Sequence, residues 1–166
     1  LRHGRGRCIF ANGSIYEGYW KDGKQAISGV FFSTNGDSYN GGWEGGLYGG
    51  QGELRFAGTH TYKGGFKAGK FNGQGQLKTS DSEYHGEFVG GLKQGKGTEK
   101  LRNNARYEGN YENDKFNGLG KYVDQVSTYE GHFLNGRKHG KGTEKWTTDG
   151  KVYTGDYVDD EKEGKG

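Results

Sequence analysis

The chain has 166 residues, of which only 28% are hydrophobic, and its formal net charge at pH 7 is +3. Glycine contributes 36 residues and aromatic residues 14%, whereas methionine and proline are absent. These values exclude a compact globule with an aliphatic core, so packing must come from aromatic rings that cover glycine backbone.

A tyrosine motif recurs along the sequence and predicts a repeat protein. The motif is Tyr-x-Gly-x-aromatic-x-x-Gly-x-x-x-Gly-x-Gly, and its copies follow one another every 22 to 24 residues. The seven copies begin at Tyr16, Tyr39, Tyr62, Tyr84, Tyr107, Tyr129 and Tyr153. Such a period is typical of arrays in which each unit must stack on its neighbours to bury apolar surface. Regularly spaced aromatic residues also argue against a disordered chain.

The two ends of the chain predict a window cut from a longer array. Residues 1–15 carry Gly4 and Gly6 and are interpreted as the second half of a truncated repeat. Residues 16–166 form the seven copies, and the last copy is incomplete because Gly164 and Gly166 close the chain where its second strand should begin. We therefore expect more repeats, or other domains, on both sides.

Each copy predicts a β-hairpin. In the second copy Tyr39, Gly41 and Trp43 alternate with polar residues, so the two rings share one face of a strand and the glycine lies between them. Residues 44–47, with the sequence Glu-Gly-Gly-Leu, predict a tight turn. The second strand is expected to begin at the paired glycines, here Gly50 and Gly52. The fold class is therefore all-β.

Catalytic and metal-binding motifs are missing from the sequence. The five histidines are scattered, and no Gly-Lys pair is followed by the Ser or Thr that opens the helix of a phosphate loop. Cys8 is the only cysteine, so we expect a reducing compartment and a packing role for its side chain. No apolar run approaches the ~18 residues that a membrane-spanning helix needs.

A Tyr-x-Gly-x-Trp hairpin repeated every ~23 residues resembles the MORN (membrane occupation and recognition nexus) repeat. The resemblance covers essentially the whole chain, with departures at Ile27, which replaces the first paired glycine, and at Asp114 and Asp160, which replace the turn glycine. It implies an elongated, single-layer, twisted antiparallel sheet, or solenoid, of stacked hairpins. An aromatic groove would run along one face of that sheet.

The resemblance also implies a function without catalysis. We expect a protein-binding or scaffolding module of a cytoskeletal or ciliary assembly, such as a radial spoke, in the cytoplasm, cytoskeleton or cilium. It would bind a partner helix or peptide along the groove or join end to end as a homo- or hetero-oligomer. The groove residues are Tyr16, Trp20, Tyr39, Trp43, Tyr62, Phe66, Tyr84, Phe88, Tyr107, Tyr111, Tyr129, Phe133, Tyr153 and Tyr157. No cofactor, metal or nucleic-acid partner is expected.

Three alternatives stay open at this point. The chain could be a peripheral membrane adaptor that makes weak contact with anionic phospholipid through basic residues of the turns. These residues are Lys21, Lys24, Lys67, Lys70, Arg137, Lys138 and Lys141. It could be the regulatory end of a larger enzyme. Finally, Leu54, Leu77, Tyr122 and Trp146 could fold over the rings and leave the groove too shallow for a partner.

Overall fold

The computed structural model describes residues 1–164 and, in that range, contains 15 β-strands and no helix. The strands are β1 (Gly4–Ile9), β2 (Ile15–Lys21), β3 (Lys24–Phe32), β4 (Ser38–Glu44), β5 (Leu47–Phe56), β6 (His60–Lys67), β7 (Lys70–Lys78), β8 (Ser82–Val89), β9 (Leu92–Leu101), β10 (Arg106–Glu112), β11 (Lys115–Val123), β12 (Ser127–Leu134), β13 (Arg137–Trp146), β14 (Val152–Val158) and β15 (Glu161–Glu163). The prediction made for Gly166 lies outside the described residues.

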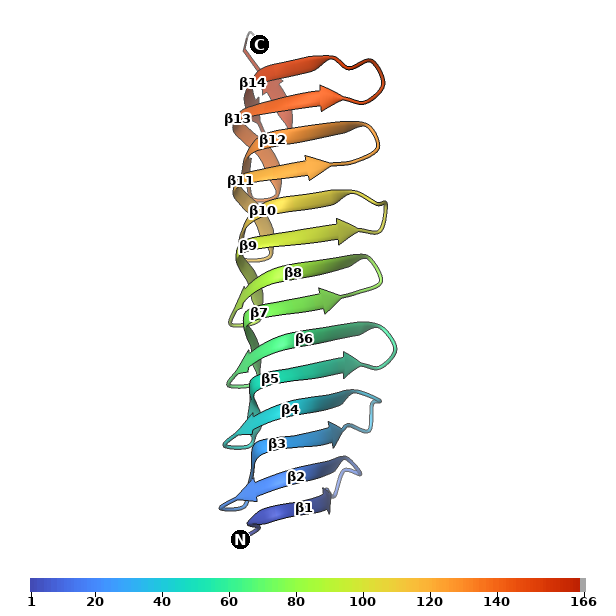
Figure 1. Ribbon diagram of the computed structural model, residues 1–166, viewed down its shortest axis with the longest axis vertical. Helices are drawn as coiled ribbons and strands as arrows, with labels where there is room; N and C mark the ends of the chain where they lie inside the picture. Colours follow the sequence, from blue (N-terminus) through green and yellow to red (C-terminus); the bar gives the residue numbers. More distant parts are fainter. Residues whose placement is uncertain (165–166) are drawn as a thin grey trace. The chain divides into compact units, whose positions relative to one another are not determined.

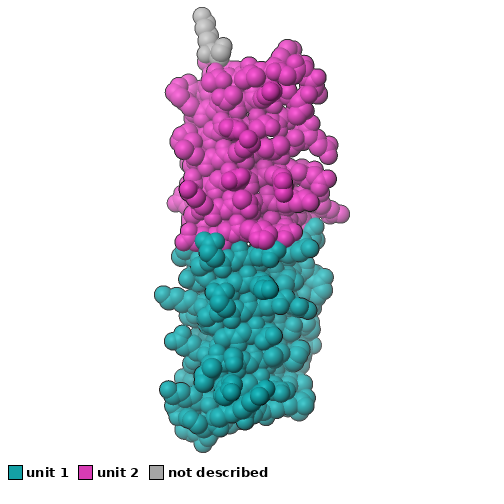
Figure 2. Space-filling view, in the orientation of Figure 1, with its two compact units in different colours: residues 1–80, 88–91 teal, residues 81–87, 92–166 magenta. Residues whose placement is uncertain are grey.

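The chain divides into two compact units (Figure 2). Unit 1 consists of Leu1–Ser80 with Phe88–Gly91, and unit 2 consists of Asp81–Glu87 with Leu92–Gly166. Within each unit every strand pairs antiparallel with the strand before it and the strand after it, so the spatial order is the chain order (Figure 1). The predicted all-β fold of antiparallel hairpins in a single layer is confirmed in each unit.

The hairpin turns have the predicted geometry. In the seven turns that join the first and second strands of the copies, both central residues have positive φ, as the type I′ turn that matches the twist of the flanking strands requires. These residues are Asp22 and Gly23, Gly45 and Gly46, Ala68 and Gly69, Gly90 and Gly91, Asn113 and Asp114, Asn135 and Gly136, and Asp159 and Asp160. Asp114 and Asp160, with φ of 67° and 74°, keep the turn shape although they replace glycine.

The prediction that the second strand begins at the paired glycines was wrong, because the glycines lie inside the strand. β5 begins at Leu47, directly after the turn. Gly41 pairs with Gly52 but Trp43 pairs with Tyr48, so β5 carries two residues more than β4 over this interval. Gly50, with φ of 68°, lies in the resulting bulge. The bulge places Tyr48 opposite Trp43.

Alternation along the strands gives the sheet of each unit two different faces. In β4 the side chains of Tyr39 and Trp43 are buried, whereas Asn40 and Glu44 are exposed. We call the face that carries the tyrosines and second aromatic residues of the first strands the ring face, and the opposite face the polar face. The polar residues that alternate with the rings face water, since Glu17, Asn40, Lys63, Glu108, Glu130 and Asp156 are all exposed.

Candidate partner-binding surface

The first tyrosine of each copy lies flat on glycine backbone. A Cβ atom added at Gly52 would lie 2.4 Å from the hydroxyl oxygen and 2.7 Å from ring carbons of Tyr39. The same approach, at 2.6 Å or less, joins Tyr62 to Gly75 and Tyr129 to Gly142. Any side chain at these glycines would displace the ring, so the prediction that rings cover the glycines beside them is confirmed.

The hydroxyl group of each first tyrosine fixes the ring at its far end. Tyr39 donates a hydrogen bond of 2.8 Å to the carbonyl oxygen of Gly42, three residues further along the chain. The other six tyrosines make the same bond, at 2.8–3.2 Å. Because the hydroxyl is satisfied internally, it needs no water or ligand to remain buried.

Within each unit, the second aromatic residue of each copy joins the tyrosines into a row. Each ring meets its neighbours edge to face, with centroids 4.9–5.4 Å apart, which is a favourable geometry for aromatic pairs. In unit 1 the row is Trp20, Tyr16, Trp43, Tyr39, Phe66, Tyr62 and Phe88. In unit 2 the row is Tyr84, Tyr111, Tyr107, Phe133, Tyr129, Tyr157 and Tyr153.

Together the two rows contain all fourteen residues expected to line the groove, and they form the cores of the two units. Thirteen of the rings are at most 7% exposed, and Tyr153 is half-buried. A partner on the ring face would therefore meet the side chains that lie above the rows. Of the four residues considered as covers, Leu54 is buried, while Leu77, Tyr122 and Trp146 are half-buried.

A further set of side chains, from the second strands, covers the tyrosines. The sequence interpretation missed it. Tyr48 stacks on Tyr39 with centroids 3.8 Å apart. Phe71 on Tyr62 and Phe116 on Tyr107 repeat this arrangement at 3.7 Å. The signal was present as a fixed offset, because each of these rings follows the second aromatic residue of its copy by five positions. We call this set the covering row.

Three copies in unit 2 have lysine in the covering row, and the third of them, Lys162, lies 5.1 Å from the ring centroid of Tyr153. The ammonium nitrogen of Lys93 lies 4.7 Å from the ring centroid of Tyr84, and that of Lys138 lies 5.0 Å from the centroid of Tyr129. Both are cation–π contacts. In unit 2 the covering row therefore reads Lys93, Phe116, Lys138 and Lys162, with one aromatic ring among three cations.

Lys93 and Lys138 are each paired with a buried glutamate. Lys93 lies 2.5 Å from a carboxylate oxygen of Glu99, which also accepts hydrogen bonds from Ser82, at 2.6 Å, and Tyr111, at 3.0 Å. In the copy that begins at Tyr129, Glu144 accepts hydrogen bonds from Lys138, from Ser127 at 2.9 Å and from Tyr157 at 3.1 Å. We call each set a polar cluster. Burial alone would raise the pKa of Glu144, but the bonds from Lys138, Ser127 and Tyr157 outweigh it and hold that pKa below its ordinary value.

The basic residues expected to contact lipid fall into two groups. Lys21, Lys24, Lys67 and Lys70, all in unit 1, are exposed. In unit 2, Arg137 lies 3.9 Å from Asp159 and Lys141 lies 3.3 Å from Asp156. Lys138 belongs to a polar cluster and is half-buried, so it is not one of the exposed basic residues. The surface charge of this turn in unit 2 is therefore largely compensated.

The buried tyrosine hydroxyls predict a loss of stability at high pH. Burial raises the pKa of Tyr39 and of Tyr62 to about 12, from an ordinary value of 10.0. A folded-state pKa above the unfolded one stabilises the fold fully below pH 10, and this contribution is lost as the pH rises through 12. We expect the free energy of unfolding to fall across this window, together with a cooperative rise in tyrosinate absorbance. Tyrosinate formation near pH 10 without unfolding would contradict the burial.

Residues 1–164 include no helix with the length and apolar composition needed to cross a membrane. The same residues contain no group of three or more His, Cys, Asp or Glu side chains that could hold a metal ion.

Comparison with known proteins identifies the repeats. The family model of the MORN repeat matches residues 1–15, 16–38, 39–59, 62–82, 84–106, 107–125, 129–151 and 153–166. No individual curated protein matches the chain.

Proposed function

Because the chain belongs to the MORN repeat family, a protein- or membrane-binding repeat type, we propose that it is a scaffolding module that binds other proteins through its ring face. The bound element would be an amphipathic helix or an extended peptide lying across successive hairpins. Assignment to a cytoskeletal or ciliary assembly rests on the family resemblance alone. End-to-end assembly and attachment to a larger enzyme remain alternatives outside this proposal.

The observation that supports the proposal is the covering row. Tyr48, Phe71 and Phe116 each present one face to a buried tyrosine and remain only half-buried, so their other surface is available to a partner. Tyrosine and other large aromatic residues supply contact area at low entropic cost and are enriched in protein interfaces. In unit 2 the ammonium groups of Lys93 and Lys138 flank Phe116. This part of the surface therefore combines cations with an aromatic ring, whereas Tyr48 and Phe71 in unit 1 are both aromatic.

Substitution of the covering row tests the proposal without removing the core. Gln25 occupies the equivalent position in the first copy, five residues after Trp20, so the fold already accommodates glutamine there. We expect the double variant Tyr48→Gln/Phe71→Gln to recover specific partners at least about tenfold less efficiently in affinity capture, because each lost anchor costs roughly 1–2 kcal/mol. The control is Leu47→Gln, which changes an exposed apolar residue of the adjacent turn. Equal recovery by the parent and the double variant would exclude the covering row as the binding surface.

A membrane-binding function is the second candidate, and the lysine pairs of unit 1 favour it. Lys21 and Lys24 face each other across one turn, and Lys67 and Lys70 across another. A surface lysine contributes about 1 kcal/mol to attraction by an anionic bilayer. We expect weak flotation with phosphatidylserine vesicles that is lost when these four lysines are changed to glutamate. Flotation should be unaffected by Arg137→Glu/Lys141→Glu, and binding that survives both sets of changes would contradict this candidate.

A further inference from the structure

Two cations oppose each other on the polar face of unit 2. Lys100 of β9 and Arg106 of β10 are direct cross-strand partners, and both side chains are exposed. Like charges at directly opposite positions destabilise a sheet. None of the ion pairs among residues 1–164 includes either side chain. The free protein therefore retains a repulsion at this point.

At two other positions on the same face of unit 2, a cation is matched by a carboxylate of the next strand. Lys121 and Glu130 are cross-strand partners whose charged atoms lie 2.5 Å apart. Lys141 and Asp156 are partners in the same way, at 3.3 Å. Lys100 and Arg106 depart from this pattern, because the position that would hold a carboxylate holds a second cation.

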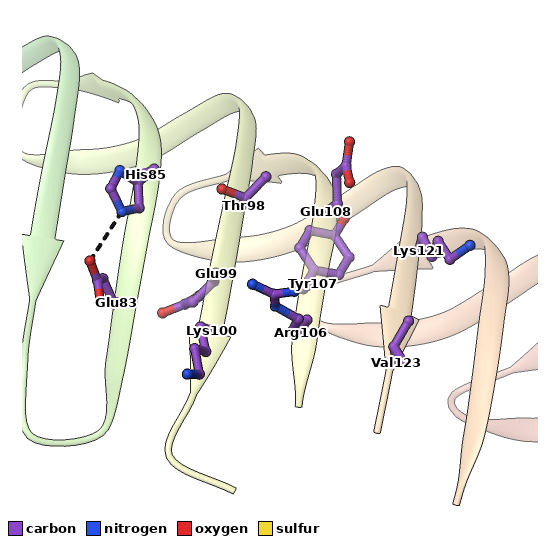
Figure 3. Close-up of a pocket in the computed structure, with 10 residues that line it drawn as sticks. All are labelled: Glu83, His85, Thr98, Glu99, Lys100, Arg106, Tyr107, Glu108, Lys121 and Val123. Atoms are coloured by element: carbon purple, nitrogen blue, oxygen red, sulfur yellow. Dashed lines mark hydrogen bonds and ion pairs between the residues drawn. The ribbon is translucent and has the colours of Figure 1, made fainter. Parts of the chain in front are cut away.

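The two cations border a hollow in the polar face (Figure 3). Its volume is about 520 Å³, which is large enough for several side chains of another molecule. Val123 adds an apolar wall, and the carboxylates of Glu83 and Glu108 lie on the border of the hollow. Glu83 accepts a hydrogen bond from His85 at 3.2 Å, drawn as the dashed line in Figure 3.

We propose that this hollow docks an acidic segment of a partner protein, with an Asp or Glu carboxylate seated between Lys100 and Arg106. The guanidinium group of Arg106 can bind a carboxylate through two parallel hydrogen bonds, and Lys100 adds a third donor. A carboxylate carries one charge, so the neighbouring Glu83 and Glu108 oppose it less than they would oppose a doubly charged phosphate. The surface lies on the opposite face from the covering row and is independent of the proposed function.

The test uses a short blocked peptide of alternating Glu and Thr, titrated into the whole chain and followed by amide chemical shifts. We expect shifts in β9 and β10, and at least about tenfold weaker binding to Lys100→Gln/Arg106→Gln, because the charged donors are removed. The control Lys145→Gln removes a lysine from the same face of β13, where its cross-strand partners Thr128 and Val152 are uncharged. It should bind the peptide like the parent. A Lys/Thr peptide should produce no shifts.

The melting temperature without peptide provides a second readout. Since Lys100 and Arg106 repel each other, Arg106→Gln should leave the melting temperature unchanged or raise it by about 1–3 °C. The peptide should raise the melting temperature of the parent and not that of the double variant. Equal peptide binding by parent and double variant, a clear drop in the melting temperature of Arg106→Gln, or shifts with inorganic phosphate but not with the peptide would each overturn the proposal.

Discussion

Replacing Trp43 with alanine is expected to lower the free energy of unfolding by about 3–5 kcal/mol, the cost of truncating a buried aromatic residue. The indole ring is 7% exposed and meets Tyr16, Tyr39 and Tyr48 with centroids 4.9–5.4 Å apart. Its Nε1 atom donates a hydrogen bond of 3.1 Å to the carbonyl oxygen of Gly29. The substitution therefore opens a cavity between two hairpins and removes a hydrogen bond to the half-buried Gly29.

Chemical denaturation followed by circular dichroism would measure this loss. The matched control is Tyr19→Ala, which removes an aromatic ring of β2 that is 40% exposed on the polar face. We expect the control to change the free energy of unfolding by less than about 1 kcal/mol. If Trp43→Ala and Tyr19→Ala had equal effects, the ring of Trp43 would not be a packing element.

Most of the fold could be predicted from the copies of the tyrosine motif, because each copy shows the alternation of side chains that is typical of a strand. Tyr39, Gly41 and Trp43 differ from their neighbours in both size and polarity, so the buried face followed from side-chain period alone. The turns could also be predicted from neighbouring residues, since two consecutive positive φ values favour Gly, Asn or Asp, which most copies have there. These features depend on residues close together in the chain.

The bulge and its consequences could not be predicted in the same way. A bulge changes which residues share a face, and the paired glycines at Gly50 and Gly52 do not show which strand carries the extra residues. For this reason Tyr48 and Phe71 were not recognised as covers of the tyrosines. Lys138 was assigned to an exposed turn, although the same bulge in β13 turns it toward Tyr129. Contacts between hairpins, rather than the motif itself, decide these positions.

The polar cluster around Glu144 leads to the second large effect. Lys138→Met is expected to destabilise the protein by about 3–5 kcal/mol, because a 6% exposed carboxylate would lose its cation. Lys145→Met, which changes an exposed lysine of the same strand, should cost less than about 1 kcal/mol. Urea unfolding at neutral pH measures both variants. A small effect of Lys138→Met would show that the Lys138–Glu144 pair is not part of the packed interior.

Replacing the whole cluster should have the opposite outcome. The hairpin β10–β11 has Ala105, Phe116 and Tyr122 at the positions equivalent to Ser127, Lys138 and Glu144, and Phe133 at the position equivalent to Tyr157. The variant Ser127→Ala/Lys138→Phe/Glu144→Tyr/Tyr157→Phe copies that arrangement and leaves no buried charge at this site. Substituting a buried ion pair by packed apolar groups is neutral or stabilising by about 1–4 kcal/mol. We therefore expect this variant to be at least as stable as the parent at pH 7.

Acid unfolding separates the two arrangements, because only the parent contains Glu144. The pKa of Glu144 is held below its ordinary value of 4.5 in the folded state, so its contribution to stability is present above pH 4.5 and is lost as the pH falls through the lowered value. The parent should lose more stability than the fourfold variant below that pH, while the other carboxylates affect both proteins alike. Parallel acid-unfolding curves would show that the hydrogen bonds from Lys138, Ser127 and Tyr157 do not favour the ionised form. A steeper loss in the parent would show that the polar cluster around Glu144 makes its hairpin dependent on an ionised carboxylate, whereas the hairpin around Tyr107 is covered by the stacked ring of Phe116.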